Sequence, residues 1–558
     1  MLRVFPAAAL LLLLGPVIAG LLGALLPAFG YLPALGGTAF SLVAFRELAA
    51  MPGVLRSALL SFATGLAATA IALAVTLLFI AAWRGTRLFR LLERLVSPLL
   101  SVPHAAAAFG LAFLVAPSGI LFRLLAMTLT GSDRPPDLLI VGDRLGVAMT
   151  AGLVAKEIPF LLLMALSALP QARAAEMARI AASLGYGRIV GFAHCVLPAL
   201  YRQLRLPVLA TLAFSSSVVD VALILGPTTP APLAVRILQW QADPDLGMRF
   251  AAAAGALLQC AVTAAALLVW IAGERLAAAL SVAPSGRHGR HDAWARQLSA
   301  AAMAIPAAAV LLGLVLLALW SVAGPWPFPR PVPAALSLSN WRHGLSALAA
   351  PLLHTLALAA ASSLVAVVLA LGILEREHRS GAGRPMRTVL SLYVPLLVPQ
   401  IALLFGLQVL FSRLRADGMF PAVALVHLLF VFPYVLLSLA DPWRQWDPRY
   451  GQVARALGRT PDAVFWRIRL PMMARPILTA AAVGFAVSIG LYLPTLLIGA
   501  GRWPTVTTEA VGLAAGGDPR LIGVTAFVQA VLPFLGFALA ILLPALLFRD
   551  RRLMRPTP

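Results

Sequence analysis

Charged residues are scarce in this chain. Of its 558 residues, 11% are charged and 61% are hydrophobic, whereas a soluble domain carries roughly 25% charged residues. The composition therefore excludes an ordinary soluble protein. Long apolar runs recur throughout instead, and such a run surrounded by lipid must be helical because its backbone has no water to bond. The sequence predicts an all-α integral membrane protein.

Cysteine and lysine are almost absent. The two cysteines, Cys195 in a polar segment and Cys260 in an apolar run, favour neither a disulfide nor a metal site. Lys156 is the only lysine, and a phosphate-binding Gly-x4-Gly-Lys loop therefore cannot occur. We expect no cofactor, no metal and no enzymatic activity of the chain's own.

The remaining charge is strongly positive, with a net value of +22 carried by arginine. Arginines gather in alternate loops, around residues 84–94, 173–202, 275–296 and 376–387, while the opposite loops hold acids such as Asp243. Arginine-rich short loops face the cytoplasm. This arrangement predicts cytoplasmic N- and C-termini, and it indicates a lipid bilayer rather than a nucleic acid as the partner.

Twelve apolar runs reach about the 20 residues that a membrane-spanning helix requires. The first six and the last six form two tandem halves, residues 1–272 and 299–558, joined by a charged cytoplasmic linker at 273–298. Because each half has an even number of spans, we expect a pseudo-two-fold axis along the membrane normal. The expected spans are 4–26, 56–82, 95–116, 145–168, 205–226, 249–272, 299–321, 351–374, 389–411, 420–440, 477–499 and 521–547.

Short motifs repeat between the halves with the same internal spacing. Pro103-His104 precedes Phe109-Gly110 in the third span, as Pro399-Gln400 precedes Phe405-Gly406 in the ninth. A proline in a span frees a backbone carbonyl. We expect His104 and Gln400 to bond such carbonyls or, alternatively, to face the passage between the halves.

Two polar segments, residues 171–203 and 442–476, repeat most clearly. Their glycines, Gly185 and Gly458, lie 273 positions apart, and each is followed after eleven residues by Leu-Pro. The pattern predicts a short helix, a glycine turn and a second helix outside the membrane. The residues expected to serve coupling are Arg179, Ile180, Ala181, Leu184, Gly185, Leu197, Pro198, Gln452, Val453, Ala454, Leu457, Gly458, Leu470 and Pro471.

These paired segments resemble the coupling loop of ABC-importer permeases, and the whole chain resembles the fused permeases of the thiamine and ferric-iron importers. The resemblance implies a type I importer fold in a bacterial inner membrane, with alternating access driven by a separate ATPase, expected to be a homodimer. ATP and its magnesium ion would be bound by that ATPase, and a periplasmic binding protein would deliver the solute. The glutamate that opens the family pattern is absent, since Arg179 and Gln452 stand there.

Polar residues within the spans are candidates for the solute path, because such groups are costly in lipid. They are Ser217 and Asp220 in the fifth span and Ser488, Tyr492 and Thr495 in the eleventh. Helix packing is the alternative role, as it is for Lys156 and Glu157 in the fourth span. An acidic lining favours a cation, and a thiamine-like vitamin, ferric iron and a polyamine all stay open. The acids also keep an ion-coupled twelve-helix secondary transporter as the alternative function.

Overall fold

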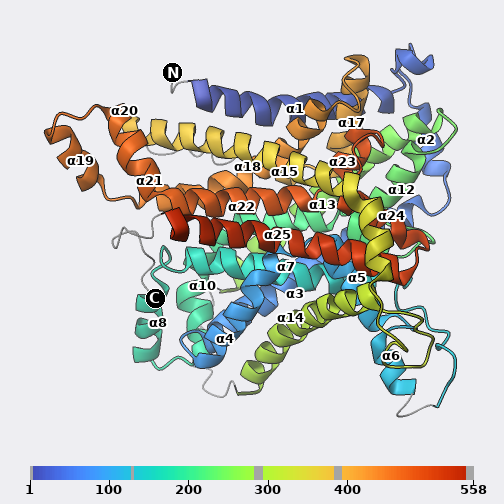
Figure 1. Ribbon diagram of the computed structural model, residues 1–558, viewed down its shortest axis with the longest axis horizontal. Coiled ribbons are helices and arrows are strands. Elements are labelled where there is room, and N and C mark those ends of the chain that lie inside the picture. The colour runs from blue at the N-terminus through green and yellow to red at the C-terminus, as the bar shows by residue number, and fades with distance from the viewer. Residues whose placement is uncertain (1–3, 127–130, 282–292, 382–392, 548–558) are drawn as a thin grey trace.

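The computed structural model describes residues 4–126, 131–281, 293–381 and 393–547. In this part of the chain the elements are helices, and the β structure consists of two isolated bridges. Most of the long helices run side by side along one direction, as expected of helices that cross a bilayer together (Figure 1). The predicted all-α class is confirmed.

Nine helical segments of the described residues are long and apolar enough to cross a membrane. They agree with nine of the twelve predicted spans, because uninterrupted apolar runs leave the backbone no other way to satisfy its hydrogen bonds. They are α1 (Val4–Ala28), α3 (Val54–Trp83), α5 with α6 (His104–Val115, Ile120–Leu125), α7 (Val147–Ala168), α13 (Met248–Ser281), α14 (Ala293–Val322), α15 (Ser339–Ser380), α18 (Phe420–Arg444) and α25 (Pro519–Leu547).

The other three predicted spans are broken rather than continuous. The fifth divides into α10 (Leu197–Ser215) and α11 (Asp220–Leu225), and the eleventh into α22 (Ala474–Gly490) and α23 (Leu493–Gly499). The ninth has a short helical stretch at 393–397 and then α17 (Gln400–Arg413), separated by Val398-Pro399. A proline disfavours helix in the residue before it, which explains the last break.

The third span also starts later than predicted. Residues 87–96 form α4 (Arg87–Val96), an amphipathic helix with Phe89, Leu92 and Val96 buried, and η2 (Ser97–Ser101) follows it. The spanning helix begins only after Pro103, which caps α5. The same Pro-induced start at Pro399 makes the third and ninth spans equivalent in structure.

The predicted linker is largely helical where the structure describes it. Helix α13 continues to Ser281 and α14 already begins at Ala293, so both enter the segment predicted as 273–298. Residues 282–292 of the linker lie outside the described residues. The apolar pattern ends before the helices do, because a helix leaving the membrane can continue as a polar one.

The two sequence halves exchange their first helices. Helix α1 packs along α17 of the second half, and α14 packs along α5 of the first. Glycines permit both crossings: a Cβ on Gly110 would lie 2.8 Å from the backbone of Gly313, and one on Gly406 would overlap the carbonyl of Gly20. The halves are therefore repeats of sequence but not separate bodies.

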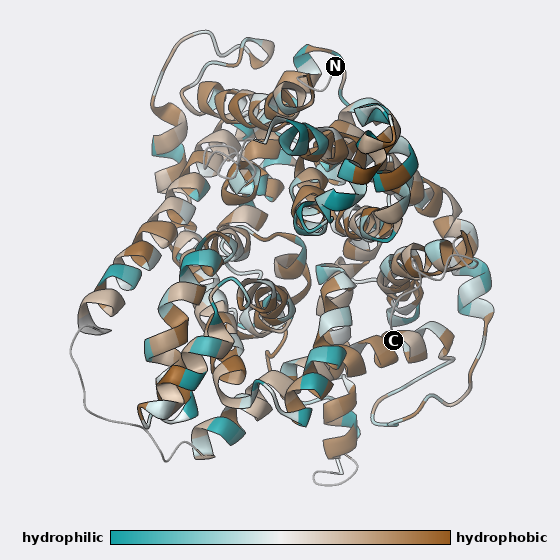
Figure 2. Ribbon diagram, turned by 90° about the vertical axis from the view of Figure 1, so that its left-hand side faces the viewer, coloured by the Kyte–Doolittle hydropathy of each residue, from teal (hydrophilic) through white to brown (hydrophobic). Residues whose placement is uncertain are grey.

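The two ends of the bundle differ. Helix α8 (Ala174–Ser183) and the pair α19 (Pro448–Ala456) and α20 (Pro461–Val464) lie at the left end of Figure 1, where α1 begins and α25 ends. The short helices α2 (Val43–Ala50), α12 (Leu233–Gln241) and α24 (Val506–Gly512) lie at the right end. Figure 2 views the molecule from the left end, with many of the long helices seen close to end-on.

Candidate functional site

Both predicted coupling segments form helical hairpins with the same turn. In the first hairpin, Gly185 follows α8 with a φ of 79°, and its N–H donates to the Ala182 carbonyl at 3.0 Å. The next N–H, that of Tyr186, donates to the Ala181 carbonyl at 3.1 Å. This pair of bonds is a Schellman motif, which ends a helix at a left-handed glycine.

The second hairpin repeats these bonds. Gly458 follows α19 with a φ of 77° and donates to the Arg455 carbonyl at 2.9 Å, while Arg459 donates to the Ala454 carbonyl at 3.0 Å. The Thr460 hydroxyl then accepts from the Ala463 N–H at 3.2 Å and caps α20. The local sequence thus builds the same hairpin twice.

A widened turn returns each hairpin to the membrane. A π-helical segment, η4 (Phe192–Val196) or η5 (Phe465–Arg469), comes directly before Leu197-Pro198 or Leu470-Pro471. A proline ring clashes with the carbonyl four residues earlier in an α-helix, and a π turn moves that carbonyl away. The Leu-Pro pairs therefore have a local structural role at the exit of both hairpins.

The outer faces of the hairpins expose apolar side chains. The exposed fractions are 43% for Ile180, 59% for Leu184, 61% for Val453 and 76% for Leu457. An amphipathic helix that leaves such residues in water is suited to a groove on a partner.

The other predicted coupling residues are either buried within the hairpins or exposed to differing degrees on their surfaces. Ala181 and Ala454 are buried inside the hairpins, so they support the turn rather than face a partner. Arg179 and Gln452 are exposed on the first helix of each hairpin, and Leu197 and Leu470 are half-buried at the exits. Pro198 is exposed and Pro471 is half-buried.

A buried arginine anchors the second hairpin, which the sequence reasoning missed. Arg469 of η5 is 2% exposed, and its guanidinium lies 4.3 Å from the ring centre of Trp443 and 4.7 Å from that of Trp446. Its Nη1 lies 3.1 Å from Glu375 Oε2 on α15, and its Nη2 donates to the Trp443 carbonyl at 2.8 Å. The signal available in the sequence was an acid at the end of an apolar span.

Further ion pairs extend this anchor. Arg379 lies 2.7 Å from the other oxygen of Glu375 and 2.7 Å from Asp462 of α20. Arg444 at the end of α18 pairs with Glu377 at 3.1 Å. The second hairpin is therefore tied to both α15 and α18.

The first hairpin is held differently. Arg188, at the start of α9 (Arg188–Gly191), donates to the Ala82 and Arg84 carbonyls at 3.1 Å each. These carbonyls lie at the C-terminal end of α3, where main-chain carbonyls have no N–H donor within the helix. Val196 occupies the position equivalent to Arg469 and is buried.

The first half contributes the charged groups of the candidate solute path. Asp220 begins α11 after the break in the fifth span, and both Asp220 and Glu157 are buried. His104 Nε2 lies 3.5 Å from Glu157 Oε1, and the His104 side chain is 33% exposed. Ser217 bonds the Ala213 carbonyl at 2.8 Å, which is a local helical bond.

The second half contributes a neutral polar group that the sequence reasoning missed. His427 of α18 is buried and joins two predicted path residues: its Nδ1 lies 2.8 Å from Ser488 Oγ and its Nε2 lies 3.0 Å from Thr495 Oγ1. Tyr492, the third predicted path residue of this half, is buried at the break of the eleventh span. A lone histidine in an apolar span was the available signal.

Lys156 has a structural role at the break of the third span. Its Nζ donates to the Leu99 carbonyl at 2.7 Å and to the Val102 carbonyl at 2.5 Å. These carbonyls lie where η2 ends before Pro103, which has no N–H to donate, and the Leu99 carbonyl also accepts from the Val102 N–H at 3.3 Å. Lys156 thus makes the hydrogen bonds to carbonyls near Pro103 that the sequence predicted for His104. His104 instead lies next to Glu157.

Matched glutamines support the breaks of the fifth and eleventh spans. Gln259 of α13 donates to the Ser216 carbonyl at 3.0 Å. Gln529 of α25 donates to Thr507 Oγ1 at 2.8 Å, and Thr507 in turn donates to the Ile489 carbonyl. Both breaks thereby keep their freed carbonyls satisfied within the membrane.

Comparisons with known proteins agree with this architecture. Residues 275–549 match the family described as "Binding-protein-dependent transport system inner membrane component". Over 536 residues the chain is 32% identical to the inner membrane ABC transporter permease protein YnjC of Escherichia coli K12, covering 96% of each chain.

Two further relatives match over shorter stretches. The molybdenum transport system permease protein ModB of Mycobacterium tuberculosis is 29% identical over 164 residues, 27% of this chain and 62% of its own. The putrescine transport system permease protein PotI of Escherichia coli K12 is 25% identical over 150 residues, 26% of this chain and 53% of its own. The chain therefore belongs to the binding-protein-dependent inner-membrane permeases of ABC transporters.

Proposed function

We propose that this chain supplies both transmembrane halves of an importer and moves a small solute from periplasm to cytoplasm. A separate ATPase docks on both hairpins and drives alternating access, and a periplasmic binding protein delivers the solute. The observation that carries the proposal is the pair of hairpins with matching Schellman bonds, exposed apolar residues at matching positions and a shared end of the molecule.

The shared end favours a cytoplasmic location for both hairpins and both termini. Both hairpins belong to the set of arginine-rich loops, which face the cytoplasm in membrane proteins. The start of α1 and the end of α25 lie at the same end of the molecule as the hairpins (Figure 1). Two hairpins of the same local geometry suit two equivalent grooves, so we expect the ATPase to be a homodimer. We expect ATP and its magnesium ion to be bound there, since Lys156 is the only lysine and lies within a span.

Motion of the hairpins has a route into the membrane. The second hairpin is tied to α15 by ion pairs and to α18 by the bond from Arg469 to the Trp443 carbonyl. The first hairpin leads directly into α10, and the second leads into α22 through a bend of 70°. A hinge at such a bend absorbs backbone rotation while the packed helices move as units. We expect the two transmembrane halves to rock about the contact between them as the two hairpins approach each other.

The charges of the central path favour a positively charged solute. Glu157 and Asp220 are both buried, and the basic groups near them are the buried Lys156, next to Glu157 in the chain, and the partly exposed His104. We expect the buried Tyr492, at the break of the eleventh span, to add an aromatic ring to this lining.

A thiamine-like organic cation or a polyamine fits this lining better than bare ferric iron. Within the described residues, no group of three or more His, Cys, Asp or Glu side chains is arranged to hold a metal ion. The names of the relatives do not distinguish between these candidate solutes, because one name refers to molybdenum and another to putrescine.

Co-purification with ATPases from the host tests the proposal. A Gly185→Val, Gly458→Val chain should lose the ATPase, because a β-branched residue does not adopt the left-handed conformation of both turns. Gly36→Val is the matched control, with a φ of 82° and no atom within 4 Å of an added Cβ, outside the hairpins. A thermal-shift screen of the associated binding protein against thiamine, ferric iron and polyamines then identifies the solute. Transport driven by an ion gradient alone, with no ATPase retained, would contradict the proposal.

A further inference from the structure

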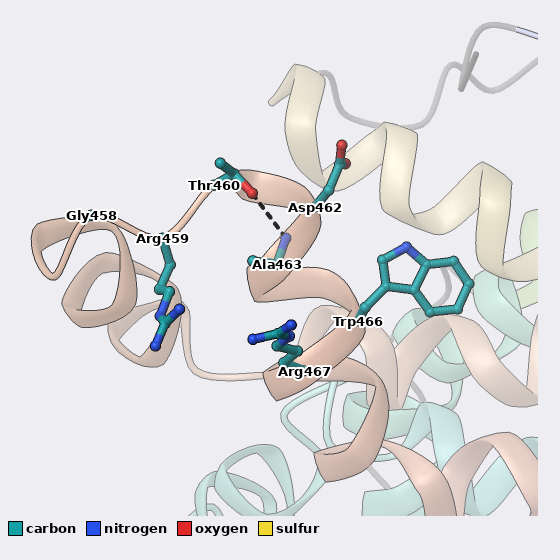
Figure 3. Close-up of a pocket in the computed structure, with 7 residues that line it drawn as sticks. All are labelled: Gly458, Arg459, Thr460, Asp462, Ala463, Trp466 and Arg467. Carbon is teal, nitrogen blue, oxygen red and sulfur yellow. Dashed lines mark hydrogen bonds between the residues drawn. The ribbon is translucent and has the colours of Figure 1, made fainter.

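The second hairpin has an open hollow beside its turn. It has a volume of about 400 Å³ and is lined by residues 458–460 of the turn, by Asp462 and Ala463 of α20 and by Trp466 and Arg467 of η5. Figure 3 shows the side chains of Arg459 and Arg467 extending into this space from opposite sides. Asp462 also borders the hollow but points away from it, and it pairs with Arg379 at 2.7 Å.

The two arginines have no acidic partner in the part of the chain that the structure describes. Two guanidinium groups that face one space repel each other unless an anion lies between them. A carboxylate accepts parallel N–H bonds from a guanidinium, which is the strongest recognition that such a group offers. The hollow therefore has the size and the donors for an acidic side chain.

The first hairpin fills the same space with its own side chains. Tyr186 and His194 occupy the positions equivalent to Arg459 and Arg467, each 273 residues earlier. Their ring centres lie 5.9 Å apart with planes inclined by 47°, so the pair closes the gap between the two arms. The space beside the turn is thus occupied by two aromatic rings in the first hairpin, whereas in the second hairpin it is open and lined by two arginines.

The position of the hollow indicates a protein rather than a lipid. Helices α19 and α20 project beyond the other helices at the left end of Figure 1. Arg459 directly follows the turn glycine, and the neighbouring Leu457 is the most exposed apolar residue of the hairpins. Any partner that covers Leu457 also reaches the mouth of the hollow.

We infer that the hollow receives a carboxylate side chain of the docked ATPase, held between Arg459 and Arg467. The inference rests on the proposed function. It assigns the positive member of the docking ion pair to this chain, at a hairpin whose family glutamate is replaced by Gln452. It also makes the two docking contacts unequal, because the first hairpin has Tyr186 and His194 at the positions of Arg459 and Arg467.

Binding of the co-purified host ATPase to the full chain in nanodiscs tests the inference. We expect Arg459→Ala, Arg467→Ala to weaken binding about tenfold or more and to flatten its dependence on salt. The control Arg87→Ala, Arg90→Ala removes the same charge from exposed positions of α4 and should change binding less than about twofold. Arg459→Tyr, Arg467→His copies the first hairpin and should weaken binding like the alanine pair, while thermal unfolding of the chain stays unchanged.

Three results would overturn the inference. Equal weakening by the α4 control would indicate nonspecific attraction between charges. A loss seen in phosphatidylglycerol nanodiscs but not in phosphatidylcholine nanodiscs would assign the hollow to a lipid headgroup. Unchanged binding of both hollow variants would leave the arginines without a docking role. Failure of the unmodified chain to bind any host ATPase is a separate result, because it refutes the proposed function itself.

Discussion

The two coupling hairpins have the same turn but different anchors. Both end their first helix with the same Schellman bonds at a left-handed glycine and exit through a π turn before Leu-Pro. The second is held by the buried Arg469 and Glu375, and the first by the exposed Arg188 on main-chain carbonyls. The comparison separates what a local sequence builds from what neighbouring helices decide.

Unequal anchors predict unequal mechanical roles. A buried ion pair with stacked aromatic rings resists displacement, whereas exposed bonds to main-chain carbonyls exchange readily with water. We therefore expect the second hairpin to move as one body with α15 and α18, and the first to move more independently of α3.

The largest effect is expected for Glu375→Ala. It leaves the guanidinium of Arg469 buried without its carboxylate, which costs about 3–5 kcal/mol. Thermal unfolding of the purified chain and amide hydrogen exchange over residues 448–472 measure it. Arg188→Ala is the matched change in the first hairpin and should cost about 1 kcal/mol. Similar losses for the two variants would remove the difference between the anchors.

The next effect concerns docking rather than folding. Leu457→Asp should weaken ATPase binding at least tenfold, about 1.4 kcal/mol or more, because it places a charge in an apolar groove. Leu184→Asp should weaken it less, since Leu184 is less exposed in the free chain. Neither should alter thermal unfolding, because both side chains are largely in water. A stability loss without a binding loss would show that these residues pack within the chain.

A smaller and equal effect is expected at the two turns. Gly185→Ala and Gly458→Ala should each lower the free energy of unfolding by about 1 kcal/mol, the cost of a left-handed Cβ. Amide exchange of each hairpin measures the two losses separately. A clearly larger loss at one glycine would mean that the turns are less alike than their hydrogen bonds indicate.

The smallest effect is expected for Asp462→Asn. Its pair with Arg379 is exposed on the Asp462 side, with 78% of that side chain in water, so its loss should cost about 0.5 kcal/mol or less. Comparison with Glu375→Ala in the same thermal assay shows whether burial decides the strength of this network. A cost near that of Glu375→Ala would show that the network acts as one unit.

Much of the architecture followed from local chemistry. Nine predicted spans agree with spanning segments because each is a predominantly apolar run of sufficient length. The hairpin turns were predictable because glycine is the residue that ends a helix in the left-handed region. The breaks at 216–219 and 491–492 were not predicted, because the bonds from Gln259 and Gln529 come from helices distant in sequence.

The path residues show the same division. Asp220 and Ser488 stand out in the sequence because polar groups are costly in lipid. Their partners do not, since His104 meets Glu157 across two spans and His427 meets Ser488 and Thr495 across two others. Long-range pairing of this kind depends on which helix faces pack together.

The sequence by itself determined the helical class, most of the spanning helices and the two glycine turns, because hydropathy and glycine act within a few residues. The tertiary structure alone decided the exchange of α1 and α14 at Gly406 and Gly110, the burial of Arg469, and the open hollow beside Arg459. These depend on close approach between distant segments, where backbone contact, desolvation and steric filling are set by the neighbour rather than by the local chain.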